Sequence, residues 1–161
     1  GVQNVVRIMS NIPAEISMAV SGIYLSSSQC NAESLEQLRE MFNCIGKLYE
    51  VKTEAELDVF TVVAGSGPAF IATYLQSYLA FMKAHRIADE TAREVLYHLI
   101  LGSTHFLNNN SFDSSALIKR VAAKGGTTEE MLHYLQSNNW YDIFSQGLEK
   151  ALEKCERLSK G

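Results

Sequence analysis

The pattern of apolar residues changes near Thr53, and this change limits the folds that the 161-residue chain can adopt. Before it, one helical pattern stands among three short strand patterns, at Val5–Met9, Met18–Leu25 and Lys47–Val51. After it, no segment has a strand pattern, and apolar residues recur at helical spacing. We therefore predict a mainly α chain, in which residues 1–52 form a small α/β portion and residues 53–161 form an all-helical domain.

Two of the predicted helices carry more apolar residues than one small domain can cover. The pattern over residues 68–85 has a wide apolar face, and the pattern over residues 90–107 is apolar most of the way round. Helices of this kind are buried on several sides. We therefore expect a second copy of the chain to cover them in an interlocked homodimer, with higher oligomers left open. A monomeric helical bundle is the alternative.

The composition is that of an ordinary soluble globular protein, with 47% hydrophobic residues and a formal net charge of −4. Because no run of Lys or Arg is present, we expect neither nucleic acid nor a membrane as a partner. We also expect no apolar stretch long enough to span a bilayer. The widely spaced Cys30, Cys44 and Cys155 indicate reduced thiols that fill the core of a cytoplasmic protein. The histidines lack the spacing of metal ligands, so no metal site is expected.

Two glycine-rich stretches, Ala64–Ala69 and Lys124–Glu130, stand directly ahead of helical patterns. The start of a helix presents unpaired N–H groups and a partial positive charge, and glycines let an anion approach them closely. These stretches are either ordinary helix starts or parts of a pocket for a small anionic substrate. In the second stretch, Thr127 and Glu130 have the spacing of a capping box.

Several polar side chains accompany these stretches. Ser66 offers a hydroxyl and a backbone N–H at the first helix start. The Thr73 hydroxyl either faces a ligand or bonds to the carbonyl of Ala69, as threonines inside helices often do. Glu54 and Asp58 lie four residues apart on one helix face. The alternative interpretation is a solvated face, or acidic residues that stabilise the positive end of the helix dipole.

With these strings in view, the chain resembles the C-terminal part of pyrroline-5-carboxylate reductase over nearly its whole length. Arg7–Pro13 is similar to that family's RxMPNxP, Glu54–Phe70 to its ExxxDxxTxxSGSGPAY, and Val121–Thr128 to its VxSPGGTT. The three strings occur in the family's order. The chain departs from the family pattern at Ser10, Ala64, Phe70, Ala123 and Lys124.

The resemblance implies a two-domain reductase that uses NADPH or NADH. Residues 1–52 would be the end of its nucleotide-binding Rossmann domain. Residues 53–161 would be a substrate-binding and dimerisation domain like the C-terminal domain of 6-phosphogluconate dehydrogenase. The GxGxxG turn that would hold the cofactor pyrophosphate is missing from these residues and would lie ahead of Gly1. We therefore expect these 161 residues alone to be inactive.

The resemblance further implies a reaction and the residues that perform it. A hydride would pass from the cofactor to the C=N carbon of 1-pyrroline-5-carboxylate, which gives L-proline. As catalytic residues, Thr73 matches a threonine that hydrogen-bonds the ring nitrogen, and Glu54 matches an acid near it. Asn11 matches an asparagine near the nicotinamide. The residues that would hold the substrate carboxylate are Ser66, Gly67, Gly125, Gly126, Thr127 and Thr128. A reductase for another small imino or keto acid and an inactive dimerisation module remain as alternatives.

Overall fold

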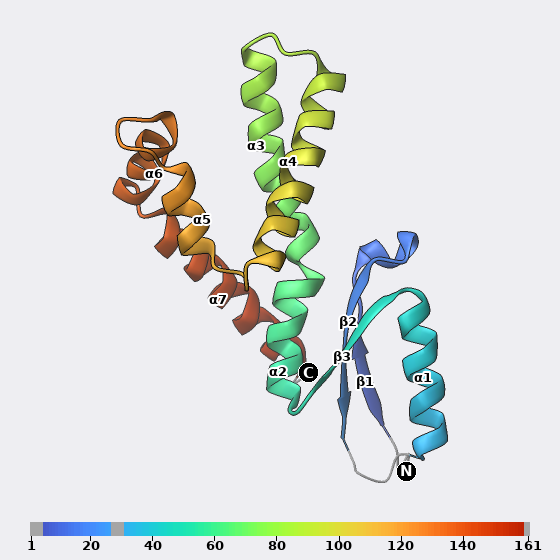
Figure 1. Ribbon diagram of the computed structural model, residues 1–161. Helices are drawn as coiled ribbons and strands as arrows, with labels where there is room; N and C mark the ends of the chain where they lie inside the picture. Colours follow the sequence, from blue (N-terminus) through green and yellow to red (C-terminus); the bar gives the residue numbers. More distant parts are fainter. Residues whose placement is uncertain (1–4, 27–30, 160–161) are drawn as a thin grey trace. The chain divides into compact units, whose positions relative to one another are not determined.

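The computed structural model describes residues 5–26 and 31–159 (Figure 1). The chain divides into two compact units: unit 1 contains residues 1–71 and 145–161, and unit 2 contains residues 72–144. The described residues are mainly helical, with a small sheet in the first part of the chain, so the predicted fold class is confirmed. The domain boundary predicted after residue 52 lies inside unit 1 and stays a prediction.

The sheet of unit 1 has three strands in the order β1-β2-β3. They are β1 (Val6–Met9), β2 (Ala19–Leu25) and β3 (Gly46–Val51). The three predicted strands are therefore confirmed, and each of their ends agrees within one residue. Strands β1 and β2 are antiparallel, with Arg7 opposite Tyr24, and β2 and β3 are parallel. A short 3-10 turn, η1 (Ile12–Ile16), connects the first two strands where Pro13 prevents β1 from continuing.

Helix α1 (Ala32–Cys44) makes the crossover from β2 to β3. It begins where the Asn31 side chain accepts a hydrogen bond from the Glu33 N–H at 3.0 Å. Gly46 follows the C-cap Ile45, in the C′ position predicted from its place after the apolar pattern. Its backbone lies so close to β2 that a Cβ atom would overlap the backbone of Ala19, so a glycine is needed for β3 to pair there.

A nearly continuous helical stretch follows the sheet. It consists of α2 (Glu54–Phe60), a π turn η2 (Thr61–Gly65) and α3 (Gly67–Ala84). By length and composition alone, this 31-residue stretch could cross a membrane, with a mean hydropathy of 1.3 in its most apolar window. The expectation that no apolar stretch is long enough is therefore wrong, because the π turn continues the helical backbone through the glycine-rich segment.

The core of unit 1 forms where α2 packs on β2. Leu57 is fully buried there, together with Ile23, Ala19 and Val62. A Cβ atom at Gly22 would press against the side chains of Leu57 and Phe60, so this glycine lets the helix approach the sheet closely. These contacts hold α2, and the π turn that follows it, against the sheet.

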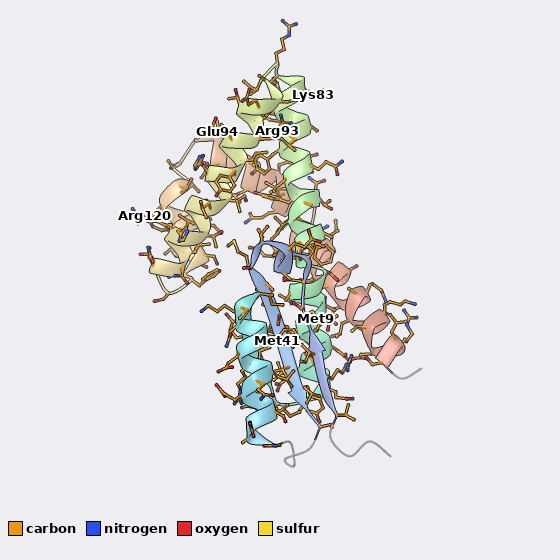
Figure 2. All side chains as sticks on the ribbon, turned by 90° about the vertical axis from the view of Figure 1, so that its right-hand side faces the viewer. Met9, Met41, Lys83, Arg93, Glu94 and Arg120 are labelled. Carbon is orange, nitrogen blue, oxygen red and sulfur yellow. The ribbon has the colours of Figure 1, made fainter. Side chains whose placement is uncertain are left out.

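Unit 2 contains only helices among its described residues. They are most of α3, α4 (Asp89–Asn109), α5 (Ser114–Val121), α6 (Thr127–Ser137) and the first residues of α7 (Trp140–Ser159), whose later part belongs to unit 1. The Asp113 side chain caps α5. Arg120 of that helix is labelled in Figure 2, and its guanidinium lies 5.2 Å from the centre of the Phe106 ring of α4.

The apolar helices predicted from the sequence have large exposed faces. Helix α3 has no buried residue, and in α4 the buried residues are Ala92 and Leu96. The large apolar side chains of these two helices that are at least a third exposed are Phe70, Ile71, Tyr74, Phe81, Val95, Tyr97, Leu99 and Leu101. The chain alone therefore leaves most of this apolar surface in contact with water.

Candidate functional site

The residues predicted to form the site fall into both units. Asn11, Glu54, Ser66 and Gly67 lie in unit 1, whereas Thr73 and Gly125–Thr128 lie in unit 2. In unit 1, the Asn11 side chain forms a hydrogen bond to a residue of another of the quoted strings, Glu54–Phe70. Its side-chain oxygen Oδ1 accepts the Val20 N–H at 2.9 Å, and its Nδ2 donates to the Ala64 carbonyl at 3.0 Å. Asn11 thereby lies beside the glycine-rich segment that contains Ser66.

The segment ahead of α3 differs from the predicted helix start. The Ser66 N–H donates to the Thr61 carbonyl at 3.2 Å, an i to i−5 bond that defines the π turn. The expectation that Ser66 offers a backbone N–H to an anion is therefore wrong, because the π turn uses that donor, and Ser66 can offer its hydroxyl. At Gly67, a Cβ atom would meet none of the described atoms within 4 Å, so the space beside it is open.

Glu54 and Asp58 have different surroundings although they lie on one helix. Glu54 is exposed at the first position of α2, where the Thr53 hydroxyl caps the helix through the Glu56 N–H at 3.1 Å. Asp58 is buried, with 6% of its surface exposed, and its carboxylate pairs with the Arg7 guanidinium at 2.8 Å. The solvated-face interpretation is therefore wrong for Asp58.

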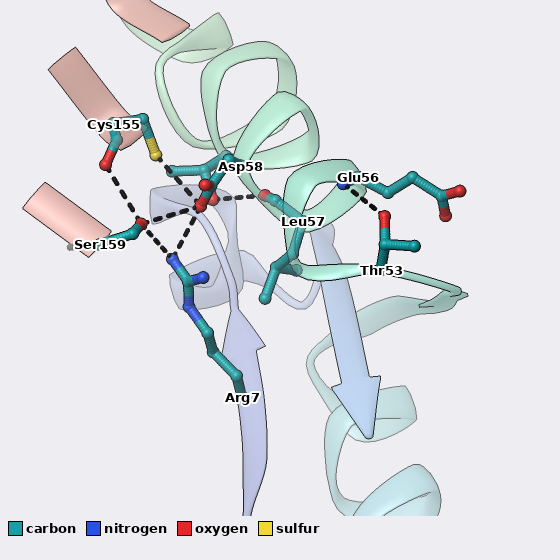
Figure 3. Close-up of polar contacts among 8 residues, drawn as sticks. Arg7, Thr53, Glu56, Leu57, Asp58, Cys155 and Ser159 are labelled. Atoms are coloured by element: carbon teal, nitrogen blue, oxygen red, sulfur yellow. Dashed lines mark hydrogen bonds and ion pairs between the residues drawn. The ribbon is translucent and has the colours of Figure 1, made fainter. Parts of the chain in front are cut away.

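The Asp58 carboxylate joins three segments that are far apart in the sequence (Figure 3). Besides Arg7 of β1, its Oδ1 accepts the Ser159 hydroxyl at 3.0 Å and lies 3.6 Å from the Cys155 thiol, both on α7. Arg7 also donates to the Ser159 hydroxyl oxygen at 3.0 Å. Burial, and then the negative charge of Asp58, raises the pKa of the Cys155 thiol. Sequence reasoning missed this cluster, although Arg7 and Asp58 both belong to the strings quoted above.

The cysteines only partly follow the prediction that they fill the core. Cys155 is half-buried, whereas Cys44 is exposed on α1, so the prediction is wrong for Cys44. Cys30 lies outside the described residues. Among the described residues, no group of three or more His, Cys, Asp or Glu side chains is close enough to hold a metal ion.

Ser10, which stands where the resembling family has a proline, has a partner in the structure. Its hydroxyl oxygen accepts a hydrogen bond of 2.8 Å from the hydroxyl of Ser21, which is fully buried in β2. The two serines satisfy each other at a place where a buried hydroxyl without a partner would be unfavourable. Ser10 therefore joins the turn after β1 to β2.

The second glycine-rich stretch begins α6 in unit 2. Gly126 is the N-cap, and Gly125 has a positive φ of 73°, which a glycine adopts at no steric cost. The Glu129 carboxylate reaches back to accept the Gly125 N–H at 2.6 Å. The predicted capping box of Thr127 with Glu130 is therefore wrong, because the helix starts one residue earlier and Glu129 supplies the acceptor. Thr127 and Thr128 occupy the first two helical positions.

Thr73 lies inside α3, seven residues after Ser66. The backbone carbonyl of Thr73 accepts the Ser77 hydroxyl at 3.4 Å. The choice between a ligand-facing Thr73 hydroxyl and one bonded within the helix stays open.

A shallow apolar groove of about 520 Å³ lies in unit 1 away from these side chains. Its lining comes from the end of β3 and from one side of α2 and the π turn: Val51, Thr53, Ala55, Glu56, Val59, Phe60 and Val63. No residue predicted for the site lines it. Val59 and Val63 are about half exposed or more, so the groove is part of the apolar surface rather than an enclosed pocket.

Comparison with known proteins gives a consistent result. A family model described as pyrroline-5-carboxylate reductase dimerisation matches residues 54–158. The pyrroline-5-carboxylate reductases of Pseudomonas aeruginosa and Staphylococcus haemolyticus are 28% and 29% identical to the chain over 156 residues. These matches cover 97% of this chain but 57% of each relative, so the chain spans little more than half the length of the curated relatives it matches.

Solved structures have the same fold. A Plasmodium falciparum pyrroline carboxylate reductase with NADP bound superposes with a TM-score of 0.90 at 21% identity, covering 96% of this chain and 60% of that one. A 1-pyrroline-5-carboxylate reductase from Streptococcus pyogenes gives 0.89 at 23% identity, covering 96% and 59%. The arrangement of the sheet and the helices is therefore shared with these proteins.

Proposed function

Because this chain belongs to the pyrroline-5-carboxylate reductase dimerisation family, we propose that it is the substrate-binding and dimerisation part of an enzyme that reduces 1-pyrroline-5-carboxylate to L-proline. NADPH or NADH supplies the hydride in this reaction. The NADP in the Plasmodium falciparum structure supports that choice of cofactor.

The observation that carries the proposal is the contact between two of the resembling strings. Arg7–Pro13 and Glu54–Phe70 are about fifty residues apart, yet Arg7 pairs with Asp58 at 2.8 Å and Asn11 bonds to Ala64 at 3.0 Å. Strings that carry a site are expected to meet in the fold. Here the segment with the proposed cofactor residue lies against the segment with Ser66 and Gly67.

The residues of unit 1 suit the roles proposed for them. A carboxamide has two N–H donors and two acceptor lone pairs, so Asn11 retains one of each for a cofactor after its bonds to Ala64 and Val20. The open space at Gly67 lets a substrate carboxylate approach the chain, and the Ser66 hydroxyl can donate to it. Glu54, exposed at the start of α2, can hold or deliver a proton. Thr73 and Gly125–Thr128 keep the roles that the resemblance implies.

We propose a homodimer because the exposed apolar side chains of α3 and α4 need a cover and because the matching family model describes dimerisation. Sedimentation at micromolar concentration is expected to give twice the chain mass of 17.9 kDa. A single species of that chain mass at every concentration would contradict the proposal.

The test of the reaction is the oxidation of NADPH by 1-pyrroline-5-carboxylate in the complete polypeptide that carries these residues. Thr73→Ala is expected to lower kcat/KM by about 10- to 100-fold, the effect of losing one hydrogen bond to a charged group. Thr104→Ala is the matched control, since Thr104 is also a threonine inside a helix, with its hydroxyl on the Ile100 carbonyl at 2.7 Å. A wild-type protein that dimerises but does not oxidise NADPH would instead be an inactive dimerisation module.

A further inference from the structure

We propose that Asn11 is a positioning residue for this reaction, because its side chain replaces a hydrogen bond that Pro68 removes and thereby holds the π turn that directs Ser66. The inference rests on the proposed role of Ser66 in binding the substrate. Its structural part, the hold of Asn11 on the π turn, can be tested without any reaction.

The origin of the π turn lies in Pro68. In a regular α-helix, the Ala64 carbonyl would accept the N–H of the residue four positions later, which is Pro68. Proline has no N–H, and its ring clashes with the carbonyl four residues before it. The helix therefore widens over Thr61–Gly65, and the Ser66 N–H bonds to Thr61 instead.

Asn11 supplies the donor that Pro68 lacks. Its Nδ2 atom bonds to the Ala64 carbonyl at 3.0 Å, and this contact is part-buried. A buried carbonyl without a donor would cost the free energy of its lost hydration, so the Asn11 amide stabilises the widened turn. The turn of the chain that carries Asn11 is itself firmly placed, since Asn11 Oδ1 accepts the Val20 N–H and Ser10 bonds to Ser21.

A second contact lies ahead of the π turn. Asp58, three residues before the turn begins, pairs with Arg7, which lies four residues before Asn11 in the chain. A Cβ atom at Gly65, next to Ala64, would lie 3.3 Å from the Met9 sulfur, so residues 7–11 also follow the helix closely there. Residues 7–11 are therefore bound to the helical segment at Asp58 and at Ala64, and they approach it at Gly65.

The π turn matters to the site because it sets the rotation of the residues after it. Each residue of an α-helix advances by about 100° around the axis. One extra residue in a turn therefore changes the direction of Ser66, relative to α2, by about that angle. If the turn relaxed to a regular α-helix, the Ser66 hydroxyl would point to another side of the helix.

The first measurement is hydrogen–deuterium exchange of the amides of residues 61–66 in the purified chain. Asn11→Ala is expected to speed the exchange of the Ser66 amide at least about 10-fold, the effect of about 1.4 kcal/mol of lost local stability. Asn11→Asp is the second variant, because it keeps the acceptor for Val20 and removes the donor to Ala64. Ser26→Ala is the control, since it removes a hydrogen bond of similar length, from the Ser26 hydroxyl to the Val5 carbonyl at 2.8 Å, at the end of β2 away from the turn that carries Asn11.

The second measurement is kinetic and uses the complete polypeptide. Asn11→Ala is expected to lower kcat/KM for 1-pyrroline-5-carboxylate by about 100-fold, as a misplacement of about 1 Å does in other enzymes. The rates are compared at saturating NADPH, whose dissociation constant is measured by fluorescence for each variant, so that a loss of the proposed cofactor contact of Asn11 does not enter the comparison. The double variant Asn11→Ala with Pro68→Ala regains a donor for Ala64 within the helix. It should recover slow exchange but not kcat/KM, because the turn then becomes a regular α-helix.

The outcomes separate the inference from the proposed function. Unchanged exchange in both Asn11 variants would overturn the inference, whatever the variants do to NADPH binding. Recovery of kcat/KM in the double variant would also overturn it. If the Asn11 variants exchange faster than the wild type but the wild-type protein does not reduce 1-pyrroline-5-carboxylate, the hold of Asn11 on the π turn stands and the proposed function alone is refuted.

Discussion

The ion pair of Arg7 with Asp58 predicts that its two partners are unequal in their effect on stability. The Asp58 side chain is 8% exposed, whereas that of Arg7 is 34% exposed. Replacing Arg7 leaves a buried carboxylate with the Ser159 hydroxyl and the Cys155 thiol as its neighbours. Replacing Asp58 leaves a guanidinium that can turn toward water. Arg7→Met should therefore destabilise the chain more than Asp58→Asn.

The magnitudes follow from the burial of each partner. Removing one partner of a fully buried pair costs about 3–5 kcal/mol. Because Arg7 is a third exposed and Ser159 still donates to the carboxylate, we expect about 2 kcal/mol for Arg7→Met. For Asp58→Asn we expect about 1 kcal/mol, since the amide oxygen can still accept from Ser159. The double variant should cost about 1 kcal/mol less than the sum of the two single variants, because the residues are in contact.

The assay is urea unfolding followed by circular dichroism at one fixed protein concentration, because dimerisation would make the midpoint depend on concentration. Thermal unfolding should agree, with a lowering of Tm by about 4–8 °C for Arg7→Met. The control is the exposed pair of Arg39 with Glu50 at 3.0 Å, where Arg39→Met should have a much smaller effect on stability than Arg7→Met, because both side chains are well solvated. Equal losses for Arg7→Met and Asp58→Asn, or losses no larger than that of the control, would refute the asymmetry argued from burial.

Three further outcomes follow from the same structure. Partial desolvation of the half-exposed Tyr74, together with a hydrogen bond of 2.9 Å from its hydroxyl to Tyr78, raises its pKa to about 12. Its contribution to stability is therefore complete below pH 10 and falls as the pH rises to about 12. Ultraviolet titration should show one late tyrosine, and Tyr78→Phe should lower the pKa of Tyr74. Asp58→Asn should lower the pKa of the Cys155 thiol and speed its alkylation at pH 8, measured by peptide mass spectrometry, and an unchanged rate would argue against their contact. Val59→Asp places a charge in the exposed apolar groove and should weaken the dimer at least about tenfold in sedimentation if a second copy covers that groove, while leaving the circular dichroism spectrum unchanged.

Many of the helices and strands could be predicted from local patterns because their own sequence contains a start or stop signal. Gly46 ends a helical pattern, and Asp113 caps α5 through the Ala116 N–H at 2.9 Å. The start of α6 was predicted one residue late. A glycine at the N-cap leaves no side-chain signal, and the carboxylate of Glu129, rather than that of Glu130, reaches back to Gly125.

The parts of the site that depend on long-range contacts could not be predicted in this way. Asp58 was interpreted together with Glu54 because helical spacing places both on one face, but burial depends on the strand that packs against that face. The sequence contains no local sign that Arg7 lies opposite Asp58 or that Ser159 joins them. The pairing depends on how the whole of unit 1 folds, because the three residues come from its distant parts.

The glycine-rich string from Gly65 to Pro68 has a different role in the fold from the one that its local sequence indicates. Read locally, Gly65, Ser66, Gly67 and Pro68 indicate a turn before a helix, and Pro68 suits the first helical position. In the fold, a helical backbone already precedes Pro68, and this proline leaves the Ala64 carbonyl without its usual N–H donor. The side chain of Asn11, in the turn after β1, donates to that carbonyl instead. Asn11 and Pro68 are therefore two halves of one hydrogen-bond requirement. Their joint presence in this chain has a structural cause that would hold for any ligand, so the chemistry of the site must be tested at Ser66 and Thr73, whose hydroxyls the π turn and α3 direct.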